Sequence, residues 1–396
     1  MQDPPAVIAD GGEYRDKVMR CLALGLESRS SRRWGVSNMR KVGFCSLLAI
    51  GAACSSEALA QVTVGKDGIK GDFGALQLQG NVTLSVQGAA IDPVEAPPPP
   101  PAELDRTGST ADASARFTLE YVSDNAWVIG IGAEVDTGNV DIADFERDEL
   151  YIFVAADWGR IELGENDGPA DTLSFHAPQV GLGQVRGDFA RYSGSVALLS
   201  VYDTRDAAKA TYLSPPIEGF RFGVSYSPEF EINGDDPIPT RRLVQENVVE
   251  LGAQFVMPVG DWVVGVSGAY VGGSSDPITT RGDLESWGGG IELRRDKLVL
   301  GAAYLDRGQS NLLLTQEPES EWNAGVAWYE ETWSVAASFA QTDEGSGTQS
   351  RFGVGGEYGF LENYFVRADA VWLESKPAIG AKRDGAVGIL ELGVRF

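Results

Sequence analysis

The chain has 396 residues and a formal net charge of -25 at neutral pH. A chain this acidic is a poor partner for nucleic acids and for anionic membrane surfaces, because both repel it. The three cysteines all lie in the first sixty residues and His176 is the single histidine, so the rest of the chain has neither a disulfide framework nor a His/Cys metal centre.

Residues 39–60 have the order of a secretory signal peptide. Arg40 and Lys41 give it a basic start, and the mostly apolar stretch 42–54 is too short to cross a bilayer as a helix. The sequence Ala-Leu-Ala at 58–60 is a cleavage site of the A-x-A type. We therefore expect this segment to be removed.

The segment before the signal, 1–38, shows no sustained hydrophobic period. A charged leader of that length is unusual before a signal peptide. We interpret it either as an extension outside the natural product, with translation starting at Met39, or as a disordered leader. Cleavage would leave the mature chain 61–396, while the alternative of a lipid on Cys54 is also open.

Apolar and polar residues alternate repeatedly through the mature chain, and no amphipathic helical stretch of useful length interrupts them. The same alternation occurs at 76–85, 116–121, 250–255 and 322–328. The clearest run places Trp127, Ile129, Ile131, Ala133 and Val135 opposite Gly130, Gly132, Glu134 and Asp136. Alternation with period two predicts strands that have one apolar face.

Short turns alternate with long polar connections between these strands. One long connection, 87–111, contains the run Pro97–Pro101, which suggests a stiff polyproline II excursion. The longest connection is 166–206. Counting the runs between breaks gives about sixteen strands of roughly 8–14 residues, the pattern of a transmembrane β-barrel.

Two features favour a membrane barrel over a soluble β-sandwich or solenoid, in which strands alternate as well. The polar faces carry glycine, serine, glutamate and arginine, which suit a wet lumen better than a dry core. Aromatic residues gather near strand ends on the apolar face, as in the girdles at membrane interfaces. They are Trp127, Trp262, Trp328, Trp333 and Tyr364 beside short turns, and Trp287, Trp322 and Trp372 near long loops. We predict an all-β, transmembrane antiparallel barrel.

The chain ends in GILELGVRF, in which Leu390, Leu392, Val394 and Phe396 occupy alternate positions. A closed barrel pairs its last strand with its first, so that no edge remains. The terminal aromatic and its apolar partners resemble the signal that the barrel-assembly machinery of Gram-negative bacteria reads.

With these features the chain resembles the general diffusion porins of alphaproteobacteria. The resemblance rests on the signal peptide, the strand count, the terminal GVRF and the stretch DWGRIELGENDGPADTL at 157–173, and it covers 61–396. It implies a homotrimer in the outer membrane that contacts lipid and the assembly machinery. It also implies a water-filled channel for passive diffusion of small hydrophilic solutes and ions.

In these porins the third loop folds into the barrel and narrows the pore, and loop 166–206 matches it by strand count. The resemblance places the loop acids Asp167, Asp171 and Asp188 against lumen-facing bases, for which parity gives Arg116, Arg160, Lys209, Arg221, Arg351 and Arg367. Separated opposite charges would set up a transverse field and, in so acidic a chain, a mild cation preference. Alternatively, the acids are solvated loop residues and the bases pair with neighbouring lumen acids.

We expect no cofactor, although divalent cations such as calcium are candidates at the acidic loops.

Two other functions remain open. A solute-selective porin would need aromatic residues stacked in the lumen, whereas most here point outward. A barrel hydrolase would need a nucleophile oriented by a base, and His176 is the only histidine. We expect no catalytic residue. The sequences Gly-Leu-Gly at 181–183 and Gly-Val-Gly at 353–355 open no helix after a parallel strand and so lack a phosphate cradle.

Overall fold

The computed structural model describes residues 61–65, 68–92, 106–137, 146–183, 192, 201, 204–231, 244–275, 281–310 and 312–396. The expected extension 1–38, the signal segment 39–60, the run Pro97–Pro101 and Asp188 lie outside the described residues. The chain divides into two units, and the fold described below belongs to the second, Val62–Phe396.

The second unit is almost entirely antiparallel sheet, as the alternation predicts. No helix among the described residues is long and apolar enough to span a membrane. The short helix α3 spans Pro169–Thr172. The strands are β1 (Gln61–Gly65), β2 (Gly68–Phe73), β3 (Leu76–Asp92), β4 (Thr107–Val122), β5 (Val128–Asp136), β6 (Glu146–Ala156), β7 (Gly159–Glu165), β8 (Ala208–Leu213), β9 (Phe220–Glu231), β10 (Val244–Val259), β11 (Trp262–Ser275), β12 (Leu284–Arg295), β13 (Leu298–Gly308), β14 (Glu319–Tyr329), β15 (Trp333–Asp343), β16 (Gly347–Gly359), β17 (Tyr364–Pro377) and β18 (Arg383–Arg395).

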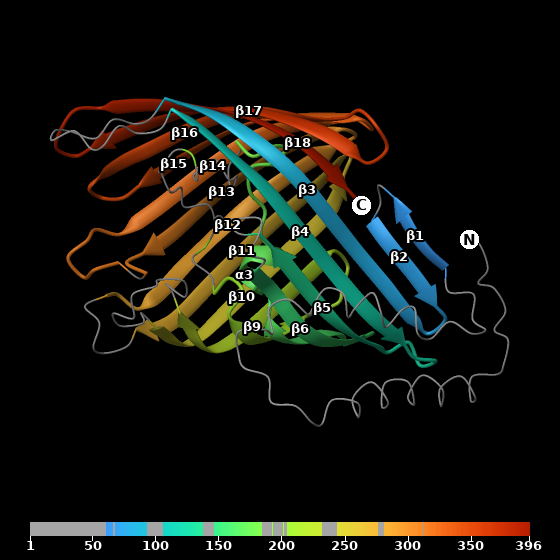
Figure 1. Cartoon of the computed structure of the whole chain (residues 1–396). Helices are drawn as coiled ribbons and strands as arrows, with labels where there is room; N and C mark the ends of the chain where they lie inside the picture. The colour runs from blue at the N-terminus through green and yellow to red at the C-terminus, as the bar shows by residue number, and fades with distance from the viewer. Residues whose placement is uncertain are drawn as a thin grey trace, which may run out of the picture. The chain divides into compact units, whose positions relative to one another are not determined.

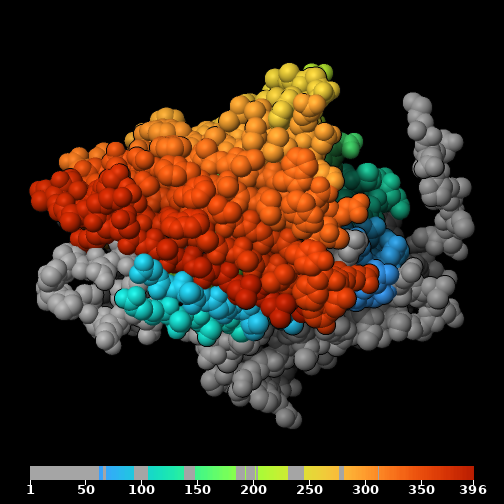
Figure 2. Space-filling view, turned by 90° about the horizontal axis from the view of Figure 1, so that it is seen from above, coloured from blue at the N-terminus to red at the C-terminus, as the bar shows by residue number. Residues whose placement is uncertain are grey.

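The strands β3 to β18 close into a ring (Figure 1), because each pairs with the next and β18 pairs with β3. Ala386 to Arg395 face Asp92 to Thr83 across this seam. Figure 2 shows the red C-terminal strands beside the blue and cyan residues of β3 and β4. The predicted antiparallel barrel of about sixteen strands is confirmed.

The last residue completes the seam. The amide of Phe396 donates to the carbonyl of Val82 at 2.8 Å, and the Val82 amide donates back at 2.9 Å. Leu390 and Leu392 are 60% and 49% exposed on the outer face, as their parity predicts. The expected closing strand is therefore present, while its role as an assembly signal stays a prediction.

Two strands that the alternation does not predict, β1 and β2, precede the barrel. β2 pairs with the first residues of β3, from Ile69 opposite Gly80 to Phe73 opposite Leu76, and β1 pairs with β2. β18 pairs with the remainder of β3, so β2 continues the same edge beyond the end of β18. The segment 61–73 is too short and too rich in glycine and charge to show sustained alternation.

The faces of the barrel are those that the alternation predicts. Trp127 and Trp372 are 46% and 50% exposed on the outside, whereas Glu250 and Asn323 are each 1% exposed on the inside. Of the predicted girdle residues, Trp262 is half-buried and the others are at least 40% exposed. An outer surface of exposed apolar side chains is stable only against lipid.

Candidate functional site

Loop 166–206 enters the barrel. The amide of Phe175 donates to Ser267 Oγ on β11 at 2.8 Å, and the amide of Ala177 donates to Asn323 Oδ1 on β14 at 2.9 Å. Further along, the amide of Leu182 donates to Asp369 Oδ2 on β17 at 3.1 Å. Because these wall side chains face inward, the loop lies in the lumen, as expected for the third loop of the barrel.

Described residues in the second half of the loop also contact the wall. The hydroxyl of Tyr192 donates to Gln87 Oε1 on β3 at 2.7 Å. Near the end of the loop, Thr204 donates from its amide to Glu250 Oε1 at 2.8 Å and from its hydroxyl to the same oxygen. The loop is thus fixed to the wall at points spread around the barrel, by buried or half-buried polar groups.

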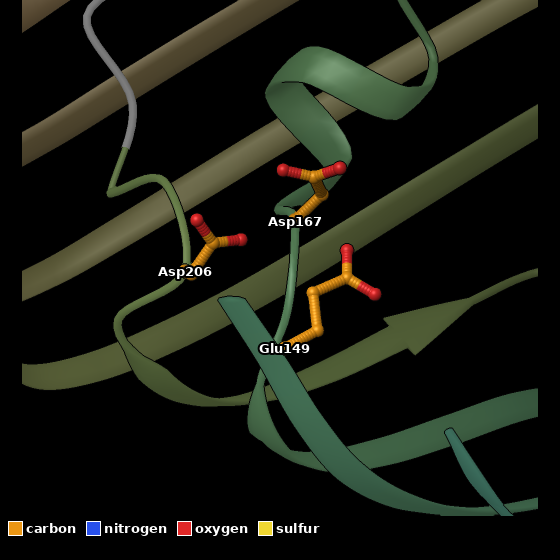
Figure 3. A group of neighbouring side chains, drawn as sticks. All are labelled: Glu149, Asp167 and Asp206. Carbon is orange, nitrogen blue, oxygen red and sulfur yellow. The ribbon is translucent and has the colours of Figure 1, made fainter. Parts of the chain in front are cut away.

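Three carboxylates meet where the loop begins and ends (Figure 3). Glu149 projects from β6, Asp167 precedes α3 and Asp206 precedes β8, and one oxygen of each lies within 4.8 Å of the others. We call these residues the acidic group. Carboxylate oxygens are the ligands that hard cations such as Ca²⁺ prefer, so these side chains have the chemistry of the candidate divalent-cation site.

One guanidinium balances part of this charge. Arg116 on β4 contacts Glu149 Oε1 through Nη2 at 3.0 Å and also pairs with Glu134 on β5. Its side chain is 53% exposed, so it borders the open lumen. Glu134 and Glu149 therefore share one guanidinium, and Glu149 links it to the other two members of the acidic group.

The structure places the three predicted loop acids differently. Asp167 belongs to the acidic group, Asp171 lies half-buried on α3 and is not a member of it, and Asp188 lies outside the described residues. Sequence reasoning missed Glu149 and Asp206. Strand parity marks Glu149 as lumen-facing, but parity alone does not say which lumen acid stands level with the loop.

Five of the six predicted wall bases pair with carboxylates on the wall: Arg116, Arg160, Lys209, Arg351 and Arg367. Two of these pairs are buried. Lys209 Nζ lies 3.8 Å from Glu250 Oε1, with side chains 0% and 1% exposed. Arg351 pairs with Glu321, with side chains 4% and 0% exposed, and Thr342 donates to the same carboxylate at 2.8 Å.

The other bases border the lumen. Arg367 pairs with Glu357 at 2.7 Å and with Glu391 at 3.1 Å. Arg160 pairs with Glu162, and Arg221 has a buried Nε that makes no hydrogen bond to the described residues. Pairing with wall acids is the arrangement that the alternative reading expected, so a field between wall bases and loop acids stays a prediction.

Aromatic rings do face the lumen, but guanidinium groups cover them. Arg160 lies 3.5 Å from the ring centroid of Phe153, and Arg367 and Arg395 lie 4.7 and 4.3 Å from that of Phe365. Each cation gains from the negative face of the ring. Phe153 and Phe365 are each 2% exposed, so neither offers a stacking surface to a passing solute.

His176 lies on the part of the loop that packs against the wall. Its Nδ1 is 2.7 Å from the carbonyl oxygen of Ala177. A general base needs a ring nitrogen directed at a nucleophile, and this contact directs one nitrogen at the backbone instead.

Comparison with known proteins agrees with this geometry. The family model described as "Gram-negative porin" matches residues 46–370. A search of the curated proteins found no match.

Several solved structures are similar to the chain. One is a porin at 14% identity with a TM-score of 0.52, covering 81% of this chain and 100% of that one. A second is the outer membrane channel DcaP of Acinetobacter baumannii, at 11% identity with a TM-score of 0.58, covering 81% and 98%. A third is the outer membrane protein OmpT of Vibrio cholerae in a trimer form, at 11% identity with a TM-score of 0.56, covering 82% and 100%. At these identities the likeness establishes the fold.

Proposed function

This chain belongs to the Gram-negative porin family, and we propose that its barrel passes small hydrophilic solutes and ions by passive diffusion, with a modest preference for cations. The observation that carries the proposal is the acidic group, which lies where the constriction loop meets the lumen wall. No catalytic step is part of this function.

The preference for cations follows from the local charge. Glu134 and Glu149 share the guanidinium of Arg116, and Asp167 and Asp206 bring two further carboxylates close to Glu149. In a narrow passage with walls of low dielectric, screening is weaker than in bulk water, so each carboxylate acts more strongly than one on an open surface. Arg116 offsets part of the field, and we therefore expect selectivity without exclusion of anions.

Neutralising the acidic group should shift the selectivity toward anions. The triple variant Glu149→Gln, Asp167→Asn and Asp206→Asn keeps side-chain size and removes three charges. Under a tenfold salt gradient across a planar bilayer, we expect the reversal potential to move by roughly 10 mV toward the anion side. Single-channel conductance should change less than the reversal potential.

Two matched variants check the origin of this shift. Arg116→Gln removes the opposing charge and should move the reversal potential toward cations. Glu330→Gln, in the short turn before β15, removes an acid that belongs neither to the acidic group nor to the loop and should leave the potential unchanged. An unchanged potential in the triple variant would place the charge filter elsewhere.

We also propose that the protein assembles as a homotrimer. The support is the family together with the trimer form of the similar Vibrio cholerae protein. Mass measurement of the detergent-solubilised protein tests this, because a single barrel of 42.3 kDa or less contradicts it.

A further inference from the structure

Six glycines form a path on the inner wall beneath the first half of the constriction loop. One lies on each consecutive strand from β9 to β14. They are Gly223, Gly252, Gly265, Gly290, Gly301 and Gly325, which we call the glycine track. The loop segment above them is 169–178.

The backbone of the loop lies directly on three of these glycines. A Cβ built on Gly252 would meet the carbonyl oxygen of Pro169, and one on Gly290 would meet the carbonyl oxygen of Phe175. A Cβ on Gly301 would likewise meet the carbonyl oxygen of His176. All three contacts would be closer than 3.0 Å, a separation that real Cβ atoms essentially never go below. The loop can occupy this path only where the wall has no side chain.

Side chains of the loop fill the space above the other three glycines. A Cβ on Gly223 would lie 2.6 Å from Pro169 Cβ, and one on Gly265 would lie 2.6 Å from the ring of Phe175. At Gly325 the nearest loop atom would be Ala177 Cβ at 3.2 Å. The loop therefore passes the strands in their own order, from β9 to β14.

Polar contacts hold the segment at the same places. Ser267, which accepts from the Phe175 amide, is paired with Gly290 in the register between β11 and β12. Asn323, which accepts from the Ala177 amide, lies two residues before Gly325 on β14. Each bond would lengthen if the loop moved off the wall.

Beyond the glycine track, the glycines that allow close contact belong to the loop and not to the wall. On β17 the wall carries a carboxylate, Asp369, and here the loop supplies Gly181 and Gly183. A Cβ on Gly181 would collide with Asp369 Oδ1, and one on Gly183 would lie 2.7 Å from Asp369 Cβ. The sequence Gly-Leu-Gly thus allows close approach of the loop to the wall, which explains a motif that no phosphate site accounts for.

We propose that the glycine track sets the cross-section of the channel by letting the loop lie flush against the wall. The inference rests on the proposed function, because it concerns the width of a conducting pore. A Cβ at a backbone contact would displace the loop toward the open lumen by on the order of 1 Å, since van der Waals overlap of that size is not tolerated. The track residues act as positioning residues.

Alanine substitutions on the track test this. Gly290→Ala and Gly301→Ala should each lower the single-channel conductance by roughly a quarter to a half, because conductance falls with the open area. Gly265→Ala should have a smaller effect, since the ring of Phe175 can turn away. Gly268→Ala is the matched control on the same strand, β11, because the nearest atom to its Cβ would be the Gly288 carbonyl oxygen at 3.8 Å.

A rescue experiment separates loop displacement from general damage to the barrel. In a Phe175→Ala background the ring is absent, so Gly265→Ala should no longer lower the conductance. Folding of every variant is checked by the heat-dependent shift in electrophoretic mobility that folded barrels show. Equal conductance in Gly290→Ala, Gly301→Ala and Gly268→Ala overturns the proposal.

A second measurement tests the position of the loop on the glycine track independently of conductance. If the parent protein folds but does not conduct, the proposed function fails. The rate at which a protease cuts the loop in the folded barrel then reports the seating of the loop. We expect faster cutting in Gly290→Ala and Gly301→Ala than in Gly268→Ala, and equal rates contradict the track.

Discussion

Replacing Glu250 by alanine is expected to lower the free energy of unfolding by about 3–5 kcal/mol, the usual cost of leaving a buried charge without its partner. The Lys209 side chain is 0% exposed, and Glu250 Oε1 lies 3.8 Å from its Nζ. The same oxygen accepts from the amide and hydroxyl of Thr204. Alanine would leave a buried ammonium group facing the carbonyl of Arg205 and would release the end of the loop.

Urea unfolding of the refolded barrel in detergent, followed by tryptophan fluorescence, measures this effect. Glu250→Gln should be less harmful because it keeps an acceptor for Thr204. Adding Lys209→Met to Glu250→Ala should recover much of the lost stability, because the buried charge is then gone. A double variant no more stable than the single one would show that the unpaired lysine is not the cause.

Deletion of Phe396 is expected to remove most of the protein from the outer membrane. The deletion strips the aromatic ring from the closing strand and also the two backbone hydrogen bonds to Val82. A seam left open at its end exposes an edge of β3 that lipid cannot satisfy. Immunoblots of separated membrane and periplasmic fractions should show accumulation and proteolysis in the periplasm.

Two substitutions at the same position distinguish loss of the ring from loss of the backbone pair. Phe396→Ala keeps both hydrogen bonds to Val82 and removes the ring, so it should behave like the deletion if the ring is the assembly signal. Phe396→Tyr keeps an aromatic ring and should reach the outer membrane at the parent level. Normal outer-membrane yield of the deletion variant would contradict this role for the terminus.

Much of the fold could be predicted because its signals are local. Alternation with period two is imposed by backbone geometry, so runs such as 127–135 identify both a strand and its outward face. The exposed Trp127 and the buried Glu250 confirm the two faces. The short hairpin strands β1 and β2 have too few residues to show alternation, and only their pairing with β3 identifies them.

The candidate site was predictable in part. By strand count, loop 166–206 matches the third loop of the family, and the described part of it lies in the lumen with Asp167 in the acidic group. Glu149 on β6 and Asp206 at the end of the loop lie close together only because of the strand register and the path of the loop. Neither can be read from the residues next to them in the sequence. The same holds for the pairs Lys209–Glu250 and Arg351–Glu321, whose partners come from different strands.

The sequence by itself therefore determined a closed antiparallel barrel with an apolar outside and a polar inside, because each residue's face is set by its immediate neighbours along the chain. Only the tertiary structure decided which lumen charges neutralise one another and where the loop lies. A glycine such as Gly290 gives no sign in the sequence that Phe175 rests on it, because that contact exists only once the wall has closed and the loop has folded back against it.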